Sequence, residues 1–588
     1  MLVTVVASRQ APIPDPARGG SSTMTDTQNV QPLKPMKARK PGKPKGRSAD
    51  PVALQEVQGL LGDRPREAHL LIEYLHLIQD RYGHLSAAHI VALARELKLA
   101  STEVYEVATF YHHFDVVKEG EEPPPAITVR VCDSVTCEMY GANELVSQLE
   151  RGLGDGVRVQ RVPCVGRCYD APVAVVGRNQ VAHATLDTVK AKVDVRELMP
   201  AAPAAIDYAQ YRADGGYDLL ADCVEGRRDV EEVVTTLENA KLRGLGGAGF
   251  PAGRKWRALR NEPEPRYVAI NIDEGEPGTF KDRYYLERDP HRFIEGTLIG
   301  AWAVNAPDVW LYLRDEYAAA EQLLNQVVAD LQADPPCRLP RIHVRRGAGA
   351  YICGEESAMI ESIEGKRGMP RLRPPLVAQI GIFGRPTLEQ NLETMHWVRD
   401  ILEKGPEWFS DQGRHGRNGF RSFSVSGRVR EPGVKVAPAG ITLRELIDEY
   451  CGGMPDGHEL YGFFPGGASG GILPASAADT PLDFDTIQEF DKNCFIGSAA
   501  IIVLSNHDSA RKMALNAMRF FHHESCGQCT PCRVGTAKAV NLMKQDRWDT
   551  ELLEELSQCM VDASICGLGQ AAPNPLRCVV KYFPEELS

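Results

Sequence analysis

The chain has 588 residues, of which 43% are hydrophobic and 25% charged, and its formal net charge is −12. This length is too great for a single hydrophobic core, so we expect about three to five domains. The longest clean apolar run, residues 496–505, is far shorter than the ~20 residues of a membrane-spanning helix, and no signal stretch opens the chain. The composition therefore predicts a cytoplasmic protein with no membrane association, and its acidic balance argues against nucleic-acid binding.

The N-terminal segment differs from the rest of the chain in charge. Residues 31–47 carry seven basic side chains, from Lys34 to Arg47, and no acidic one, in a stretch rich in Pro and Gly. Too few large apolar residues lie here to form a core, which predicts a disordered basic tail over residues 1–50. A solvated tail and an arm lying on an acidic partner subunit both fit this pattern, and Met24 is an alternative start.

The first folded part of the chain is expected to be helical. Residues 51–118 have apolar side chains at helical spacing, clearest in residues 68–78 and 90–97, which predicts a small helical bundle. Residues 119–200 then form an α+β unit of thioredoxin-like pattern. Its expected strands are residues 127–131, 173–176 and 180–183.

The remainder divides by composition and pattern. Residues 201–214 are a linker, and residues 215–415 alternate helical stretches with short apolar strands, which predicts a layered α/β domain. Residues 416–507 favour a compact ββαβ unit, and residues 508–588 are helical. The clearest strands of the α/β domain are residues 267–271 and 309–313.

Two groups of cysteines indicate metal centres, because closely spaced thiols in a reducing compartment are usually ligands. The first group is Cys132, Cys137, Cys164 and Cys168. Neither of its pairs has the two-residue spacing of zinc ribbons, so four thiolates here favour a [2Fe–2S] centre. Left without a metal, these cysteines would be exposed, since residues 162–169 are turn-like.

The second group predicts a [4Fe–4S] cluster. Cys526, Cys529 and Cys532 have the spacing with which three thiolates reach one cubane. Cys566 is the preferred fourth ligand because the glycines beside it let its loop close on the cluster, with Cys559 and Cys578 as alternatives. The other cysteines are interpreted as core or incidental residues.

A glycine-rich stretch between the cysteine groups favours a nucleotide or flavin site. Gly244, Gly246 and Gly249 match the dinucleotide fingerprint, yet they follow a helical stretch rather than the strand of a Rossmann turn. The glycines still let backbone N–H groups approach a phosphate, and Lys255 supplies a cation. Two later loops, residues 271–282 and 347–357, combine glycines with acids, and solvated acidic loops are the alternative interpretation.

Taken together, these motifs resemble a known family. The chain resembles the 24 kDa-type and 51 kDa-type subunits of respiratory complex I fused end to end, over residues 52–200 and 215–580. The most specific segments are Arg243–Pro251, Asp273–Arg283 and Glu524–Arg533. The resemblance implies a multidomain α/β and α+β fold. Its parts would be a helical cap, a thioredoxin-like [2Fe–2S] domain, a Rossmann-like FMN and NAD domain, a ubiquitin-like (SLBB-type) domain and a C-terminal helical [4Fe–4S] domain.

The resemblance also implies the site residues. Phe250, Glu276 and Glu356 would touch NAD(H), with no general acid or base and with the two glutamates as positioning groups. Arg373 and Leu376 stand where the family usually has Lys and Phe, so nucleotide contacts there are less secure. FMN would be held by Gly244, Gly246, Gly247, Lys255, Asn271, Asp273, Glu274, Gly354, Glu355, Asn391 and Thr394.

The function that the resemblance implies is that of a diaphorase subunit. It would exchange hydride between NAD and FMN and electrons with the two clusters. Similar fusions that serve hydrogenases often lack some of the N-terminal cluster cysteines, whereas all four are present here. The resemblance therefore favours a formate dehydrogenase partner, a larger subunit with molybdenum or tungsten and further Fe–S clusters. A NAD-reducing hydrogenase, a complex I-like NADH dehydrogenase and a non-enzymatic electron-relay scaffold are the alternatives.

Overall fold

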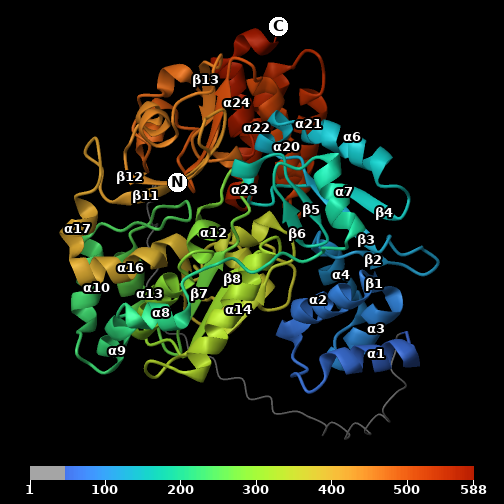
Figure 1. The fold of residues 1–588 in the computed structure, drawn as a ribbon, viewed down its shortest axis with the longest axis vertical. Helices are drawn as coiled ribbons and strands as arrows, with labels where there is room; N and C mark the ends of the chain where they lie inside the picture. The colour runs from blue at the N-terminus through green and yellow to red at the C-terminus, as the bar shows by residue number, and fades with distance from the viewer. Residues whose placement is uncertain (1–46, 588) are drawn as a thin grey trace, which may run out of the picture. The chain divides into compact units, whose positions relative to one another are not determined.

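The computed structural model describes residues 47–587 (Figure 1). Nearly all of the predicted basic tail lies outside these residues. From Ala49 onward the described chain forms one compact unit, so the predicted domain boundaries stay predictions. Within residues 47–587, no helix is long and apolar enough to cross a membrane.

The predicted helical bundle is confirmed, and Figure 1 draws it in blue. Asp50 caps the first helix by accepting from the N–H groups of Val52 and Ala53. Gly83 ends the second helix in the left-handed conformation. The helices are α1 (Pro51–Leu61), α2 (Leu71–Tyr82), α3 (Ala87–Leu97) and α4 (Ser101–Phe110).

The three strands predicted after the bundle are confirmed, and a fourth joins them in a sheet of order β4-β3-β5-β6. β3 and β4 are parallel, and β5 is antiparallel to its neighbours β3 and β6. This sheet and its helices have a hydrophobic core of their own. The elements are β3 (Ile127–Cys132), α5 (Val135–Met139), α6 (Ala142–Gly152), β4 (Val157–Val162), β5 (Ala174–Val176), β6 (Asn179–Val181) and α7 (Leu186–Asp194).

The predicted α/β domain contains a four-stranded, fully parallel sheet of order β10-β7-β8-β9. The chain runs from β7 through β8 to β9 on one side and then crosses back to β10 on the other side of β7, so a crevice is expected where the carboxyl ends of β7 and β10 meet. The strands are β7 (Tyr267–Ile272), β8 (Asp308–Leu313), β9 (Arg341–Arg346) and β10 (Thr387–Asn391). The helices are α9 (Asp218–Val224), α10 (Val230–Asn239), α11 (Ala252–Arg260), α12 (Lys281–Leu286), α13 (Pro290–Ala303), α14 (Ala318–Ala333), α15 (Glu356–Ile363), α16 (Leu392–Lys404) and α17 (Pro406–Ser410). The segment predicted as a linker, residues 201–214, contains a further helix, α8 (Tyr208–Ala213).

The predicted ββαβ unit is a larger, five-stranded mixed sheet of order β12-β11-β15-β13-β14. Its expected helix is a single turn, α18, that continues as a π-helix over Leu446–Tyr450. The other elements are β11 (Phe420–Gly427), β12 (Gly433–Pro438), α18 (Leu443–Glu445), β13 (Leu460–Phe464), β14 (Leu473–Pro474), α19 (Thr486–Phe490) and β15 (Ala500–Ser505).

The C-terminal part is helical, as predicted. The loop after α20 and the start of α21 carry the Cys526 motif, and the turn before α23 carries Cys566. The helices are α20 (Ala510–His523), α21 (Thr530–Met543), α22 (Thr550–Ala563), α23 (Gly567–Ala571) and α24 (Asn574–Tyr582).

Candidate functional site

The glycine-rich loop joins α10 to α11, so the predicted helix before it is confirmed and the Rossmann turn is absent from this position. The loop closes on itself, because the N–H of Gly244 donates to the carbonyl of Phe250 at 2.8 Å. Gly249 has a φ of +66°, and a Cβ there would lie 2.7 Å from the ring of Phe484. Glycine is therefore required at this turn.

This loop lies over the end of β10. The N–H of Leu245 donates to the Thr394 hydroxyl at 2.8 Å, and a Cβ on Gly246 would approach the Cβ of Asn391 to 3.0 Å. Asn391 in turn caps α16 by accepting from the N–H of Glu393. Residues predicted to bind FMN thus come together from two segments, the glycine-rich loop and the start of α16, at the expected crevice between β7 and β10.

The end of β7 contributes an amide and an acid to the same crevice. The Asn271 amide donates to the carbonyl of Gly354 at 2.9 Å, which ties β7 to the loop before α15. Asp273 has a buried Oδ2 with no hydrogen-bond partner among the described residues. Burial raises the pKa of Asp273 well above its usual value. A buried polar atom without a partner fits a site that is completed by a ligand.

A row of alternating charges lines one side of the crevice. Lys255 Nζ lies 3.0 Å from Glu389 and 3.9 Å from Glu356, and Arg373 lies 3.0 Å from Glu356. Arg373 also pairs with Glu355, which caps α15. Burial raises the pKa of Glu356, and Lys255 opposes this shift. The Arg at position 373 therefore keeps a cation beside the two predicted glutamates.

Glu274 and Glu276 lie in one motif but face different partners. Glu274 accepts from the N–H groups of Asp282 and Arg283, so its carboxylate caps the start of α12. Glu276 accepts from the N–H of Ser469 at 2.7 Å and from the Tyr351 hydroxyl. Burial raises the pKa of each to about 7. Glu274 has the contacts of a structural residue, whereas Glu276 connects three loops around the crevice.

Phe250 is one of the residues that line an open pocket of about 950 Å³, on the α10–α11 side of the glycine-rich loop. Its ring is 50% exposed, and the Arg254 guanidinium lies 5.7 Å from its centre. An exposed aromatic face beside a cation is suited to a planar, anionic ligand such as a nucleotide.

The first group of cysteines converges after β3 and before β5. Cys132 and Cys137 are buried, and Cys164 and Cys168 have their sulfurs 3.3 Å apart. Hydrogen bonds with Cys137 and Cys164, together with burial, raise the pKa of Cys132 well above its usual value. The expected exposure of residues 162–169 is wrong, because Phe280 and Tyr169 pack over Cys164 and Cys168.

The second group gathers at the start of α21. Cys526 and Cys529 are partly exposed and Cys532 is buried. A Cβ on Gly569, three residues after Cys566, would lie 2.9 Å from the Cβ of Cys532, so the Cys566 turn packs against this motif. Burial raises the pKa of Cys566 to about 12. Of the alternatives for the fourth ligand, Cys559 is exposed. The sulfur of Cys578 lies 3.3 Å from that of Cys494 instead.

Several residues of the site have no local sequence signal. Glu389 and Ser469 reach Lys255 and Glu276 from distant segments. The buried guanidinium of Arg314 donates to the carbonyls of Cys164 and Glu274. It therefore links the first cysteine group to the loop after β7, residues 273–280, called the β7 loop below. These contacts depend on tertiary packing, which spacing along the chain does not reveal.

Comparison with known families identifies these parts. Residues 237–400 match the Nuo51 FMN-binding domain, and residues 57–196 match the thioredoxin-like [2Fe-2S] ferredoxin. Residues 422–473 match the SLBB domain, and residues 512–588 match the NADH-ubiquinone oxidoreductase-F iron-sulfur binding region.

The chain covers most of the length of individual relatives. It is 39% identical over 391 residues to an NADH-quinone oxidoreductase subunit of Rhizobium meliloti, a match of 64% of this chain and 92% of the relative. The chain belongs to the complex I 51 kDa-type NADH-binding flavoprotein family. The mitochondrial NADH-ubiquinone oxidoreductase 51 kDa subunit of Neurospora crassa is 38% identical, with 60% of this chain and 76% of that relative covered.

A solved structure resembles nearly the whole flavoprotein. It is a chain of an NAD⁺-reducing [NiFe]-hydrogenase in the H₂-reduced state, with a TM-score of 0.78 and 30% identity over 89% of this chain and 93% of that chain. The predicted multidomain fold is thereby confirmed. The matched domains also support the predicted FMN, NAD, [2Fe–2S] and [4Fe–4S] cofactors.

Proposed function

We propose that this flavoprotein is the diaphorase subunit of a larger enzyme, in which it moves electrons between NAD(H) and a partner through FMN and two iron–sulfur clusters. The observation that supports this most is the compact arrangement of the two cysteine groups around the crevice. Arg314 links Cys164 to the loop after β7. On the other side, the N–H of Tyr351 donates to Glu524, two residues before Cys526, at 2.9 Å.

Bound FMN would exchange a hydride with NAD(H) and single electrons with the clusters, which is the chemistry of the cofactor itself. The protein would bind, orient and keep water out. The glycine-rich loop and Lys255 would receive an anionic group, and the free Oδ2 of Asp273 would accept a hydrogen bond. The exposed ring of Phe250 would contact the nucleotide.

The cysteines would hold the clusters as thiolates. Cys132, Cys137, Cys164 and Cys168 would bind the [2Fe–2S] cluster. Cys526, Cys529, Cys532 and Cys566 would bind the [4Fe–4S] cluster. Phe280 and the tight packing around Cys164 would limit the access of water to the first cluster.

For the partner, we propose a formate dehydrogenase subunit with a molybdenum or tungsten cofactor. The presence of all four N-terminal cluster cysteines supports this choice. The similarity to a chain of an NAD⁺-reducing [NiFe]-hydrogenase favours a hydrogenase partner about equally, so it stands as the second candidate.

The native complex distinguishes the two partners. We expect purification through this chain to yield molybdenum or tungsten and formate-dependent reduction of NAD⁺. Nickel together with hydrogen-dependent reduction of NAD⁺ would identify the second candidate and refute the first. A chain that purifies with FMN and iron yet fails to reduce an artificial dye with NADH would contradict the diaphorase function itself.

A further inference from the structure

Two backbone carbonyls of the loop before α15 are held by histidines of the helical bundle. His76 in α2 donates from Nε2 to the carbonyl of Gly347 at 2.9 Å, and the N–H of His113 donates to the carbonyl of Ala348 at 3.2 Å. This loop, residues 347–355, carries Gly354 and Glu355 and leads into Glu356. The bundle, which is remote in sequence, therefore reaches the predicted nucleotide loop.

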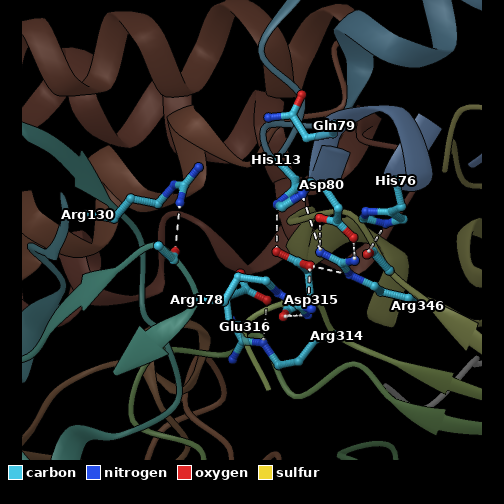
Figure 2. Close-up of polar contacts among 12 residues, drawn as sticks. His76, Gln79, Asp80, His113, Arg130, Arg178, Arg314, Asp315, Glu316 and Arg346 are labelled. Carbon is cyan, nitrogen blue, oxygen red and sulfur yellow. Dashed lines mark hydrogen bonds and ion pairs between the residues drawn. The ribbon is translucent and has the colours of Figure 1, made fainter. Parts of the chain in front are cut away.

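An ion-pair network fixes His113 in place (Figure 2). Its Nδ1 lies 2.7 Å from Asp315, which follows β8. Arg346, at the end of β9, lies 2.6 Å from Asp315 and 2.6 Å from Asp80 of the bundle. Burial raises the pKa of Asp315, but Arg346 and His113 together lower it well below its usual value. Asp315 therefore stays ionised and joins the bundle to the ends of two strands.

The same cluster is poorly suited to a metal ion. His76, His113 and Asp315 each offer one donor atom within 4.8 Å of the others. However, His76 already donates to the Gly347 carbonyl, and both Arg346 and Arg178 pair with Asp315. Two guanidinium groups at this distance repel a further cation. The contacts are those of a network that positions a loop.

Other anchors of the loop come from elements outside the bundle, among them the Tyr351 hydroxyl on Glu276 and Arg373 on Glu355. The N–H of Gly347 donates to Leu313, the N–H of Tyr351 donates to Glu524, and the carbonyl of Gly354 accepts from Asn271. Each comes from a different element, so no continuous strand pairing fixes the backbone. The bonds from His76 and His113 therefore tie the loop to the bundle, whereas the other anchors tie it to the sheet and to the C-terminal helices.

We propose that His76 and His113 are positioning residues of the nucleotide site, and that the helical bundle thereby sets the affinity for NAD(H). The inference rests on the proposed function, because the nucleotide contacts of residues 354–356 are part of it. His76 would hold the start of the loop directly. His113 would act indirectly. Its imidazole is fixed by Asp315, which places the His113 backbone N–H that bonds to the Ala348 carbonyl.

The test uses NADH-driven dye reduction by the full chain. It compares two substitutions that remove a histidine ring with two that keep a hydrogen-bond donor in its place. We expect His76→Leu and His113→Ala to raise the KM for NADH about fivefold, the effect of one hydrogen bond, with kcat almost unchanged. His76→Gln keeps a donor near Nε2 and His113→Asn keeps one near Nδ1, so both should recover most of the affinity.

His89 provides the matched control. It is a buried histidine of the same bundle whose ring bonds to Glu56 at 2.9 Å and stacks on Tyr82, both within the bundle. His89→Leu should lower the thermal stability without changing the KM. An unchanged KM in both removals, with FMN retained, would overturn the inference, and so would an equal rise in the control. A wild-type chain without dye reduction would instead refute the proposed function.

Hydrogen exchange on the wild-type protein tests the same point without any variant. Adding NADH should increase the protection of residues 347–355 and also of residues 71–82 and 111–114 in the bundle. If the protection of the loop increases while that of the bundle segments stays the same, the bundle does not respond to the nucleotide. That result would overturn the inference even where a variant fails to fold.

Discussion

At the scale of single residues, the acids of the β7 loop are not equivalent. Glu274 caps α12, whereas Glu276 connects Tyr351 and Ser469 across the crevice. Burial raises the pKa of Glu276 to about 7, so its charge changes near neutral pH. Below this pH the group is a neutral acid, and above it the group is a carboxylate.

Glu276 should make nucleotide affinity depend on pH. The carboxylate that forms above pH 7 repels the phosphates of NADH, so the KM should rise about fivefold between pH 6 and pH 8. Glu276→Gln should remove this dependence while keeping the low-pH KM. Steady-state kinetics of the wild-type chain and of Glu276→Gln over this pH range measure this dependence. A slope that persists in Glu276→Gln would contradict its assignment to Glu276 and point to another acid such as Glu274, whose pKa is also about 7.

At the scale of elements, the C-terminal loops decide which cysteines meet. The turn that carries Cys566 packs against Cys532 through Gly569, whereas α24 brings Cys578 to Cys494. The glycines around position 566 were the sequence signal for this choice. No sequence signal indicates the contact between Cys494 and Cys578, because the two residues are isolated in the sequence and meet only in the folded chain.

Serine substitution distinguishes the predicted cluster ligand Cys566 from Cys578. Cys566→Ser should lose most of the [4Fe–4S] cluster, since a cubane needs four ligands, and should keep FMN. Cys578→Ser, at a cysteine with a different neighbour, should retain the cluster. Iron content and the EPR spectrum of the reduced protein measure this. Loss of the cluster in Cys578→Ser alone would show that the ligand assignment is wrong.

How much of the site was predictable also varies between elements. The cysteine groups and the glycine loop were found because their chemistry requires fixed spacing along the chain. Sequence reasoning does not find the burial of Cys164, because Phe280, from the loop before α12, covers it. Likewise, the pairing of Lys255 with Glu389 and the hold of His76 on Gly347 come from packing between distant segments.

At the scale of the whole molecule, one compact unit holds a flavin domain between two cysteine centres. Hydrogen bonds connect this domain to both cysteine groups. Arg314 bonds to the Cys164 carbonyl on the [2Fe–2S] side, and Tyr351 bonds to Glu524 on the [4Fe–4S] side. The helical bundle also bonds to the loop before α15. Such an arrangement suits a protein that passes electrons in steps to a partner.

Anaerobic titration of the purified chain with NADH tests this account most directly. We expect one FMN and about six iron atoms per chain, with the flavin and cluster absorption both bleached by NADH and EPR signals from both reduced clusters. A chain that binds FMN and iron but whose clusters stay oxidised after excess NADH would contradict the account, as would zinc in place of iron.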